Sequence, residues 1–167
     1  KYVYLNTYSP FEAVSTFFQM YRDIAEKEWN YEASGEQLGW AVPIYVGETD
    51  EIAHKEAKPH IEAFYNKFLR MTNEMLLPPG YTTLKSMKKI AEAKREMLSG
   101  GREISRLMDN RMFICGSPNT VQEILGECHD QVGLEHIVCT LQFGTLPHEL
   151  TVKNLELFSK EVMPQLR

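Results

Sequence analysis

The sequence lacks a basic patch, a membrane-length apolar run and a leader-like start. Its formal net charge is −5, and its lysines and arginines form no cluster, which argues against a nucleic-acid partner. The longest apolar runs fall well short of the ~20 residues that a membrane-spanning helix needs, and no positively charged segment followed by an apolar one opens the chain. We therefore expect a cytoplasmic protein with no membrane partner.

Cysteine is also scarce, and metal-binding spacings are missing. Cys115, Cys128 and Cys139 are odd in number, and neither Cys-x-x-Cys nor His-x-x-x-His occurs. We expect the three thiols to be small buried side chains of a reducing compartment, and we expect no metal site. A Walker loop and a GxGxxG motif are absent as well, so the common nucleotide-binding classes are not indicated.

A helix followed by a strand is the clearest pattern that the sequence does contain. Ser117 is the expected N-cap, Pro118 fits the first helical position, and Gly133 is the expected end of the helix. The apolar run 137–143 has the composition of a strand that is buried on both faces. A helix packed on such a strand is the repeating unit of parallel α/β folds. At 167 residues, the whole chain, 1–167, is expected to form one domain.

The first half of the chain continues this alternation. Residues 2–7 are β-prone, and Ser9-Pro10-Phe11-Glu12 predicts a capping box that starts a helix of about 20 residues. Residues 39–47 predict a second strand, in which Pro43 fits where one side of the strand lacks a neighbour. Thr49 is the expected cap of the next helix, and Pro59 predicts a kink or a break in it.

The second half is expected to be rich in helix. The segment 77–111 is predicted to be an inserted lid, with Pro78-Pro79-Gly80 as its hinge. A last helix is expected from Pro147 to Pro164. The predicted order is strand, helix, strand, a long helical stretch, helix, strand, helix.

Three segments resemble a known family. YVGETDE at 45–51, GSPNTV at 116–121 and LFSKEVMPQLR at 157–167, in this order and spacing, resemble the C-terminal part of a bacterial luciferase-like flavin-dependent monooxygenase. The resemblance covers nearly the whole chain from Tyr4 onward.

The resemblance implies a helix-rich α/β fold, a partial (β/α)8 TIM barrel that contains about the last three strands and an inserted helical segment. The implied activity is an oxidoreductase that oxidises a small organic substrate with O2 and reduced flavin. The implied cofactor is FMN, with a deazaflavin as the alternative, and a separate flavin reductase supplies it in reduced form. Because the family holds the flavin phosphate mainly through its first half, no phosphate ligand is assigned to this chain. The implied partners are the missing N-terminal half or a second copy of the chain.

Candidate pocket residues follow from the position of barrel active sites at the C-terminal ends of the strands. No catalytic residue is assigned, and the alternative role of each candidate is a turn, a cap or a solvated helix face. Glu48 after the second strand is a weaker candidate, because it also fits an acidic lead-in to a helix. The substrate or flavin pocket candidates are Asn6, Thr7, Tyr8, Tyr81, Lys85, Gln142, Thr145 and His148.

Two other functions stay open. A non-catalytic half-barrel would bind flavin or a partner chain and self-associate, because uncovered strand edges and apolar faces favour association. An unrelated α/β enzyme is the third interpretation. The sequence does not indicate the substrate.

Overall fold

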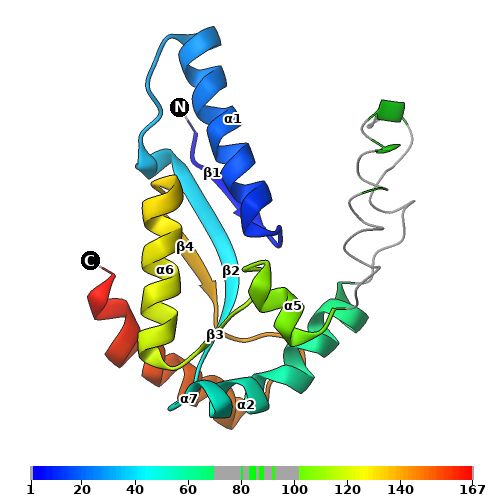
Figure 1. Ribbon diagram of the computed structural model, residues 1–167, viewed down its shortest axis with the longest axis vertical. Helices are drawn as coiled ribbons and strands as arrows, with labels where there is room; N and C mark the ends of the chain where they lie inside the picture. The colour runs from blue at the N-terminus through cyan, green and yellow to red at the C-terminus, as the bar shows by residue number, and fades with distance from the viewer. Residues whose placement is uncertain are drawn as a thin grey trace.

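A parallel sheet and a set of helices make up the computed structural model, which describes residues 2–69, 80, 83–85, 87–88, 92 and 102–166 (Figure 1). The strands of the described part are β1 Tyr4–Thr7, β2 Leu38–Val46, β3 Ile114–Gly116 and β4 His136–Thr140. Its α-helices are α1 Phe11–Trp29, α2 Asp50–Ala63, α5 Ile104–Asp109, α6 Pro118–Val132 and α7 His148–Leu157. Short turns of 3-10 or π-helix cover Gly35–Gln37, Phe64–Phe68, Phe158–Val162 and Met163–Gln165.

Strand β2 is the common partner of the other three strands, and every pairing is parallel. Its residues 38–41 pair with β1 and its residues 39–43 pair with β4, so these two strands lie on opposite edges of β2. Residues 44–46 pair with β3. The expected set of three strands is thus corrected to four, because three residues are too few for β3 to show a periodic pattern. A barrel pairs strands in chain order, whereas here β4 lies beside β2.

The core lies on both sides of β2, whose nine residues are all buried. Side chains alternate along a strand, and the even-numbered ones, such as Trp40 and Ile44, pack with α1 and α6. Tyr45 points to the other face, where it packs with α2, α5 and Phe143. Pro43 pairs with Thr140 of β4, beyond the end of the β1 ladder and before the start of the β3 ladder. The prediction that one side of the strand lacks a neighbour at Pro43 is confirmed.

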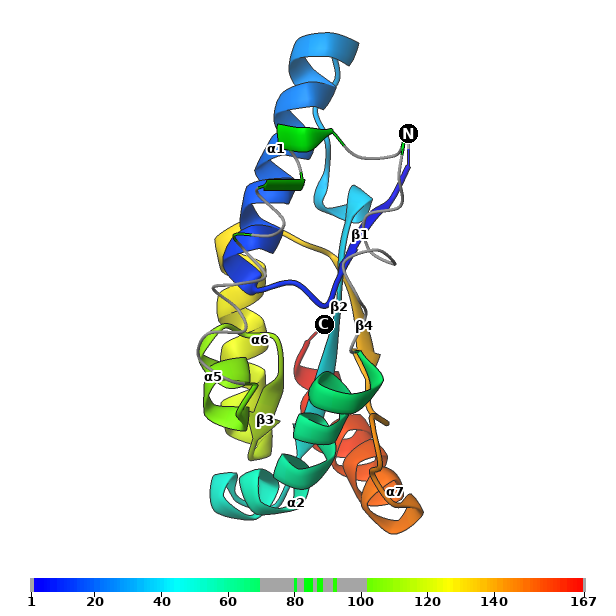
Figure 2. The ribbon, with the colours of Figure 1, turned by 90° about the vertical axis from the view of Figure 1, so that its right-hand side faces the viewer.

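One face of the sheet is left open near β1 and β4. The helices α1 and α6 lie together on the other face (Figure 2). On the open face, Leu5 is 43% exposed and Val138 is 49% exposed. The prediction that the strand after α6 is buried on both faces is therefore wrong. Its apolar composition resembled that of a central strand, but β4 is an edge strand.

The helix boundaries follow the sequence signals with two exceptions. Ser117 caps α6 by accepting a hydrogen bond from Thr120 N, and Gly133 ends that helix at a positive φ of 60°. Helix α1 begins after Pro10 and has no side-chain cap, so the predicted capping box at Ser9 is wrong. Helix α2 continues through Pro59, so a break at that residue does not occur, and the alternative, a kink, stays a prediction.

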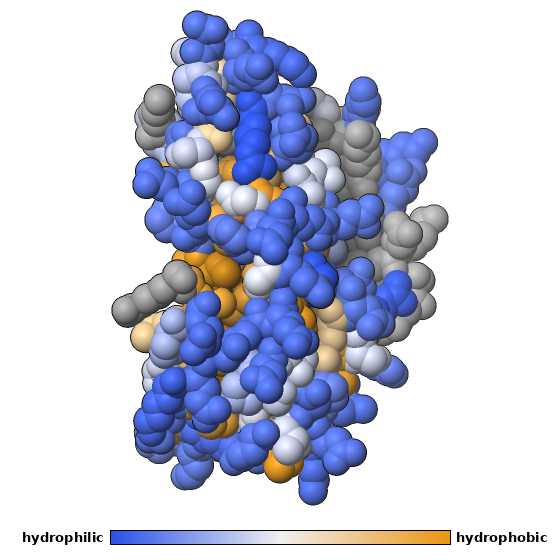
Figure 3. Space-filling model, turned by 60° about the vertical axis from the view of Figure 1, so that its left-hand side comes forward, coloured by the Kyte–Doolittle hydropathy of each residue, from blue (hydrophilic) through white to orange (hydrophobic). Residues whose placement is uncertain are grey.

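The predicted lid, 77–111, lies mostly outside the described residues and stays a prediction. Its last part contains α5, which packs Ile104 and Leu107 into the core beside α2. In the part of the chain that the structure describes, no helix has the length and apolarity to cross a membrane. The face in Figure 3 is mostly hydrophilic, and its hydrophobic atoms gather across its middle.

Candidate functional site

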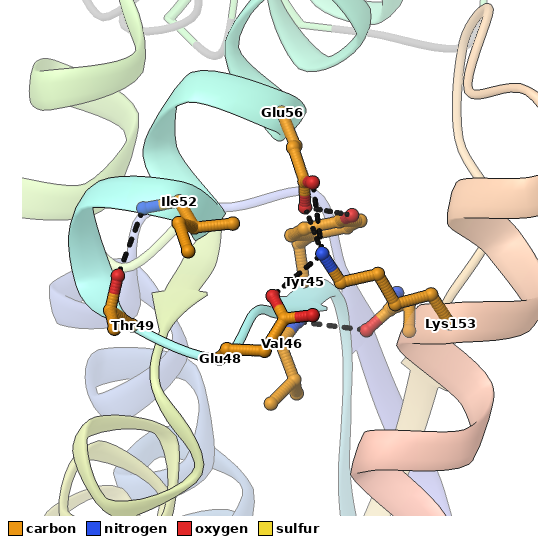
Figure 4. A network of polar contacts seen from close by, with 8 residues as sticks. Tyr45, Val46, Glu48, Thr49, Ile52, Glu56 and Lys153 are labelled. Atoms are coloured by element: carbon orange, nitrogen blue, oxygen red, sulfur yellow. Dashed lines mark hydrogen bonds and ion pairs between the residues drawn. The ribbon is translucent and has the colours of Figure 1, made fainter.

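A polar cluster lies where β2 ends and α2 begins (Figure 4). Lys153 of α7 contacts Glu48 at 2.6 Å and Glu56 of α2 at 2.8 Å. The hydroxyl of Tyr45 donates to the same Glu56 carboxylate at 2.8 Å. Thr49 caps α2 beside this cluster by accepting a hydrogen bond from Ile52 N. The cluster therefore joins the end of β2 to α2 and α7.

The protonation states of the cluster are fixed by its contacts. Burial, and then the hydrogen bond to Glu56, raise the pKa of Tyr45, which stays a hydroxyl donor. The hydrogen bond from Lys153 lowers the pKa of Glu48. Burial alone would lower the pKa of Lys153, but its bonds to Glu48 and Glu56 outweigh burial and raise it. At neutral pH the cluster thus holds charged, mutually paired groups, which suits a clamp better than a general base.

A buried amide fixes α7 against the sheet next to this cluster. Asn154 is fully buried, and its Nδ2 donates to Ile44 O at 2.8 Å and to Leu141 O at 2.9 Å. Its Oδ1 accepts from Val46 N at 2.8 Å. These backbone groups lie past the residues at which β2 and β4 pair. One side chain thus replaces strand pairing at this edge and positions the loop that follows β4.

That loop packs tightly on α2. Gly144 has a positive φ of 55°, and a Cβ atom there would lie 2.3 Å from His60 O. The Thr145 hydroxyl is 2.8 Å from His60 Nδ1. Burial lowers the pKa of His60, which favours the neutral imidazole. On the other side, the ring of Tyr8 lies 5.8 Å from that of Phe64.

The structure places two of the predicted pocket residues against the same helical segment. Tyr8 and Thr145 come from opposite ends of the chain, and both contact the segment 60–64 of α2 and the turn after it. Asn6 lies within β1 in register with Trp40, so its side chain faces the helix-covered side and is buried. Its Nδ2 donates to the Tyr4 hydroxyl, and its Oδ1 has no partner among the described residues.

The other predicted pocket residues lie on the surface or outside the described residues. Thr7, Lys85, Gln142 and His148 are exposed, and Tyr81 lies outside the described residues. The functional roles of all these candidates stay predictions.

Sequence reasoning missed Glu56, His60, Lys153 and Asn154. Their contacts join residues about 85 to 110 positions apart, which periodicity within a helix cannot reveal. Nothing in the local sequence around these four residues indicated their contacts.

The helix N-termini at this end of the sheet do not fit the phosphate of FMN. Phosphates bind where free N–H groups and positive charge meet. Here the Asp50 carboxylate accepts a hydrogen bond from Ser117 N at 2.6 Å, where α6 starts, and this bond lowers the pKa of Asp50. Helix α2 begins with Asp50 and Glu51, and α7 carries Glu149 in its first turn. In addition, Lys153 is already paired with two carboxylates.

Metal binding is not indicated by the described residues either, because no group of three His, Cys, Asp or Glu side chains there has the geometry to hold an ion.

Parts of longer solved structures share this fold. Monooxygenase RslO1 from Streptomyces bottropensis aligns over 98% of this chain and 41% of its own, with a TM-score of 0.58 and 17% identity. A second match is the oxygenating constituent of 3,6-diketocamphane monooxygenase from Pseudomonas putida, a type II Baeyer–Villiger monooxygenase in complex with FMN. It aligns over 96% of this chain and 42% of its own, with a TM-score of 0.62 and 18% identity.

The fold resembles that of the luciferase-like flavin monooxygenases. Riboflavin lyase RcaE, with modified FMN and riboflavin, also aligns, over 98% of this chain and 38% of its own, with a TM-score of 0.51 and 14% identity. The chain thus spans about two fifths of the length of these proteins. No protein-family model and no curated protein sequence matches it. The family resemblance noted from three short segments is confirmed at the level of the fold.

Proposed function

We propose that this chain is the C-terminal portion of a flavin-dependent monooxygenase, and that β4, which lies beside β2 here, pairs in chain order once the rest of a (β/α)8 barrel is present. The complete enzyme would oxidise a small organic substrate with O2 and reduced flavin. The observation that carries the proposal is the alignment of 96% of this chain with a monooxygenase in complex with FMN. When bound, the flavin supplies the activation of O2.

The chain's own contribution would be one wall of the substrate site. Tyr8 contacts Phe64 and Thr145 contacts His60, one helical turn away, at the C-terminal side of the sheet, which is the end where barrel enzymes bind their substrates. Because the described helix N-termini carry carboxylates, the rest of the fold would hold the flavin phosphate. FMN is the cofactor that the proposal favours, a deazaflavin is its alternative, and a separate reductase would deliver it reduced.

A non-catalytic scaffold is the second candidate function. It is favoured by the polar cluster around Lys153, in which every described charge is paired, and by the open sheet face. Such a scaffold would bind a partner chain and perform no oxygenation.

Turnover by the native assembly distinguishes the two. The chain would be tagged at its genomic locus, isolated with whatever accompanies it, and supplied with enzymatically reduced FMN and O2. Long-chain aldehydes, alkanesulfonates and cyclic ketones would be offered in turn, and products identified by mass spectrometry. A product that carries one oxygen atom from ¹⁸O₂ and requires reduced flavin supports the monooxygenase. An intact assembly that neither binds FMN nor oxygenates any of these compounds supports the scaffold.

A further inference from the structure

A hollow lined by aromatic side chains lies at the end of the sheet opposite the polar cluster. Tyr2 precedes β1, whereas Trp29 and Tyr31 precede β2, so these residues lie at the N-terminal ends of the parallel strands. Figure 1 and Figure 2 both place the end of α1 at the opposite end of the molecule from α2 and α7. The hollow has a volume of about 390 Å³ and is lined by Tyr2, Tyr21, Ile24, Ala25, Trp29 and Tyr31. We call it the aromatic hollow, and its volume is within the range of small-molecule sites.

The tyrosine hydroxyls of the aromatic hollow are engaged with the protein itself. The Tyr21 hydroxyl donates to Tyr2 O at 2.8 Å and accepts a hydrogen bond from Gln37 Nε2 at 3.1 Å. The Tyr31 hydroxyl lies 3.4 Å from the Tyr21 hydroxyl. These contacts fix the start of the chain and the turn before β2 against α1. The surface that remains for a ligand is therefore mainly ring and aliphatic carbon.

The rings give this surface a preference for positive charge. The face of an aromatic ring carries negative electrostatic potential, and tryptophan attracts a cation more strongly than tyrosine or phenylalanine does. Trp29 is 70% exposed, so its ring is accessible to a ligand. Among the described residues, no lysine or arginine lines the hollow. A cation would thus gain from the rings in addition to the burial that any apolar ligand would gain.

A carboxylate lies beside the aromatic hollow. Glu28 follows Ile24 by four positions and Ala25 by three, which places it on the same side of α1 as these two lining residues. It is exposed, and none of the ion pairs within the described part of the chain includes it. The neighbouring Lys27 pairs with Asp23 at 3.0 Å. Glu28 can therefore balance the charge of a cation in the hollow.

A second hollow adds to the negative charge nearby. It has a volume of about 440 Å³ and meets the aromatic hollow at Tyr31, which lines both. Arg22 is a cation in its lining, but it donates to Val132 O at 2.6 Å, so its charge is directed to the backbone. The lining also includes three carboxylates, those of Asp23, Glu26 and Glu32.

We propose that the aromatic hollow binds a small quaternary ammonium ion, whose charge the rings and Glu28 stabilise together. A primary ammonium group needs hydrogen-bond acceptors for its three N–H donors, and the engaged hydroxyls do not offer them. A quaternary ammonium group has no N–H donor and is bound by aromatic faces. The proposed site lies away from the C-terminal side of the sheet, so the ligand is distinct from the substrate and the flavin of the proposed function.

Isothermal titration calorimetry of the tagged native assembly tests the proposal, and it requires no flavin. Choline is the probe, and 3,3-dimethylbutan-1-ol is its uncharged isostere, in which carbon replaces the quaternary nitrogen. We expect choline to bind at least ~10-fold more tightly than the isostere, because a desolvated cation on aromatic rings gains more than a neutral group of the same shape.

Two variants locate the site. Trp29→Leu keeps an apolar side chain but removes the ring, so it should weaken choline binding at least ~10-fold. Phe17→Leu is its matched control, because Phe17 is an exposed aromatic residue of the same helix that does not line the hollow, and it should bind choline as the wild type does. Glu28→Gln should weaken the binding of choline but not that of the isostere, whereas Glu12→Gln, at the other end of α1, should change neither.

Circular dichroism checks that all four variants are folded. The proposal is overturned by the absence of saturable choline binding up to about 20 mM, or by an isostere that binds as tightly as choline. It is also overturned if Trp29→Leu binds choline as the wild type does, or if Phe17→Leu weakens binding to the same extent. Oxygenation is measured separately in the turnover experiment, so a failure of the proposed function and a failure of this site are distinguishable.

Discussion

Removing the Asn154 side chain should cost more stability than any other single truncation on α7. Asn154→Ala leaves Val46 N, Ile44 O and Leu141 O without their partner in a fully buried place. Each unsatisfied buried group costs about 1–3 kcal/mol, and partial relaxation reduces the sum, so we expect a loss of about 3–5 kcal/mol. That is a large part of the 5–15 kcal/mol that typically stabilises a domain.

Urea unfolding followed by circular dichroism measures this loss. Leu155→Ala, one residue along the same helix and half exposed, is the control and should cost less than ~1 kcal/mol. Asn154→Asp keeps an acceptor for Val46 N but turns a carboxylate toward two carbonyl oxygens, so it should be as damaging as Asn154→Ala. If Asn154→Ala unfolds at the wild-type midpoint with an unchanged slope, the amide does not replace strand pairing as we argue.

Three further predictions concern local features of the fold. Because the folded-state pKa of Glu48 is lowered, its contribution to stability is present at neutral pH and is lost as the pH falls through that pKa. Glu48→Gln should therefore flatten the decline of the melting temperature below pH 5, and an unchanged pH profile would contradict the ion pair. In urea unfolding, Gly144→Ala should destabilise the protein by more than ~2 kcal/mol, since it combines a positive φ with a backbone clash. Gly126→Ala, in open space within α6, should stabilise it by about 0.5–1 kcal/mol, and equal effects of the two variants would show that the loop at Gly144 is not packed as described. Burial raises the pKa of all three cysteine thiols, so a disulfide-exchange reagent at pH 7 should label the native chain slowly and the unfolded chain at once. A thiol that is labelled rapidly in the native chain would refute the buried position of that cysteine.

The parts of the fold that sequence predicted well are set by local chemistry. Ser117, Pro118 and Gly133 bound α6 because capping and positive φ depend on a few neighbouring residues. The strand around Tyr45 was found because an apolar run of nine residues is unambiguous when it is central. The same reasoning failed for the strand that contains Val138, since composition does not show whether a neighbour covers it.

The site was harder to predict because it depends on contacts between distant segments. Tyr8 and Thr145 were named from their positions after strands, and the structure places both against α2. Lys153 gave no local signal, because its carboxylate partners lie about a hundred residues earlier. The choice to assign no phosphate ligand followed from the family resemblance alone. Among the described residues, the bond from Ser117 N to Asp50 is a physical reason why the start of α6 does not suit a phosphate.

Native mass spectrometry of the tagged assembly, followed by denaturation in the same run, tests whether this chain is one part of a flavin-dependent monooxygenase. We expect an assembly that contains a second polypeptide besides this chain and that releases FMN or a deazaflavin when it is denatured. Flavin that stays with the isolated 167-residue chain would contradict the argument from the helix N-termini. An assembly made only of this chain and free of flavin would contradict the proposed monooxygenase.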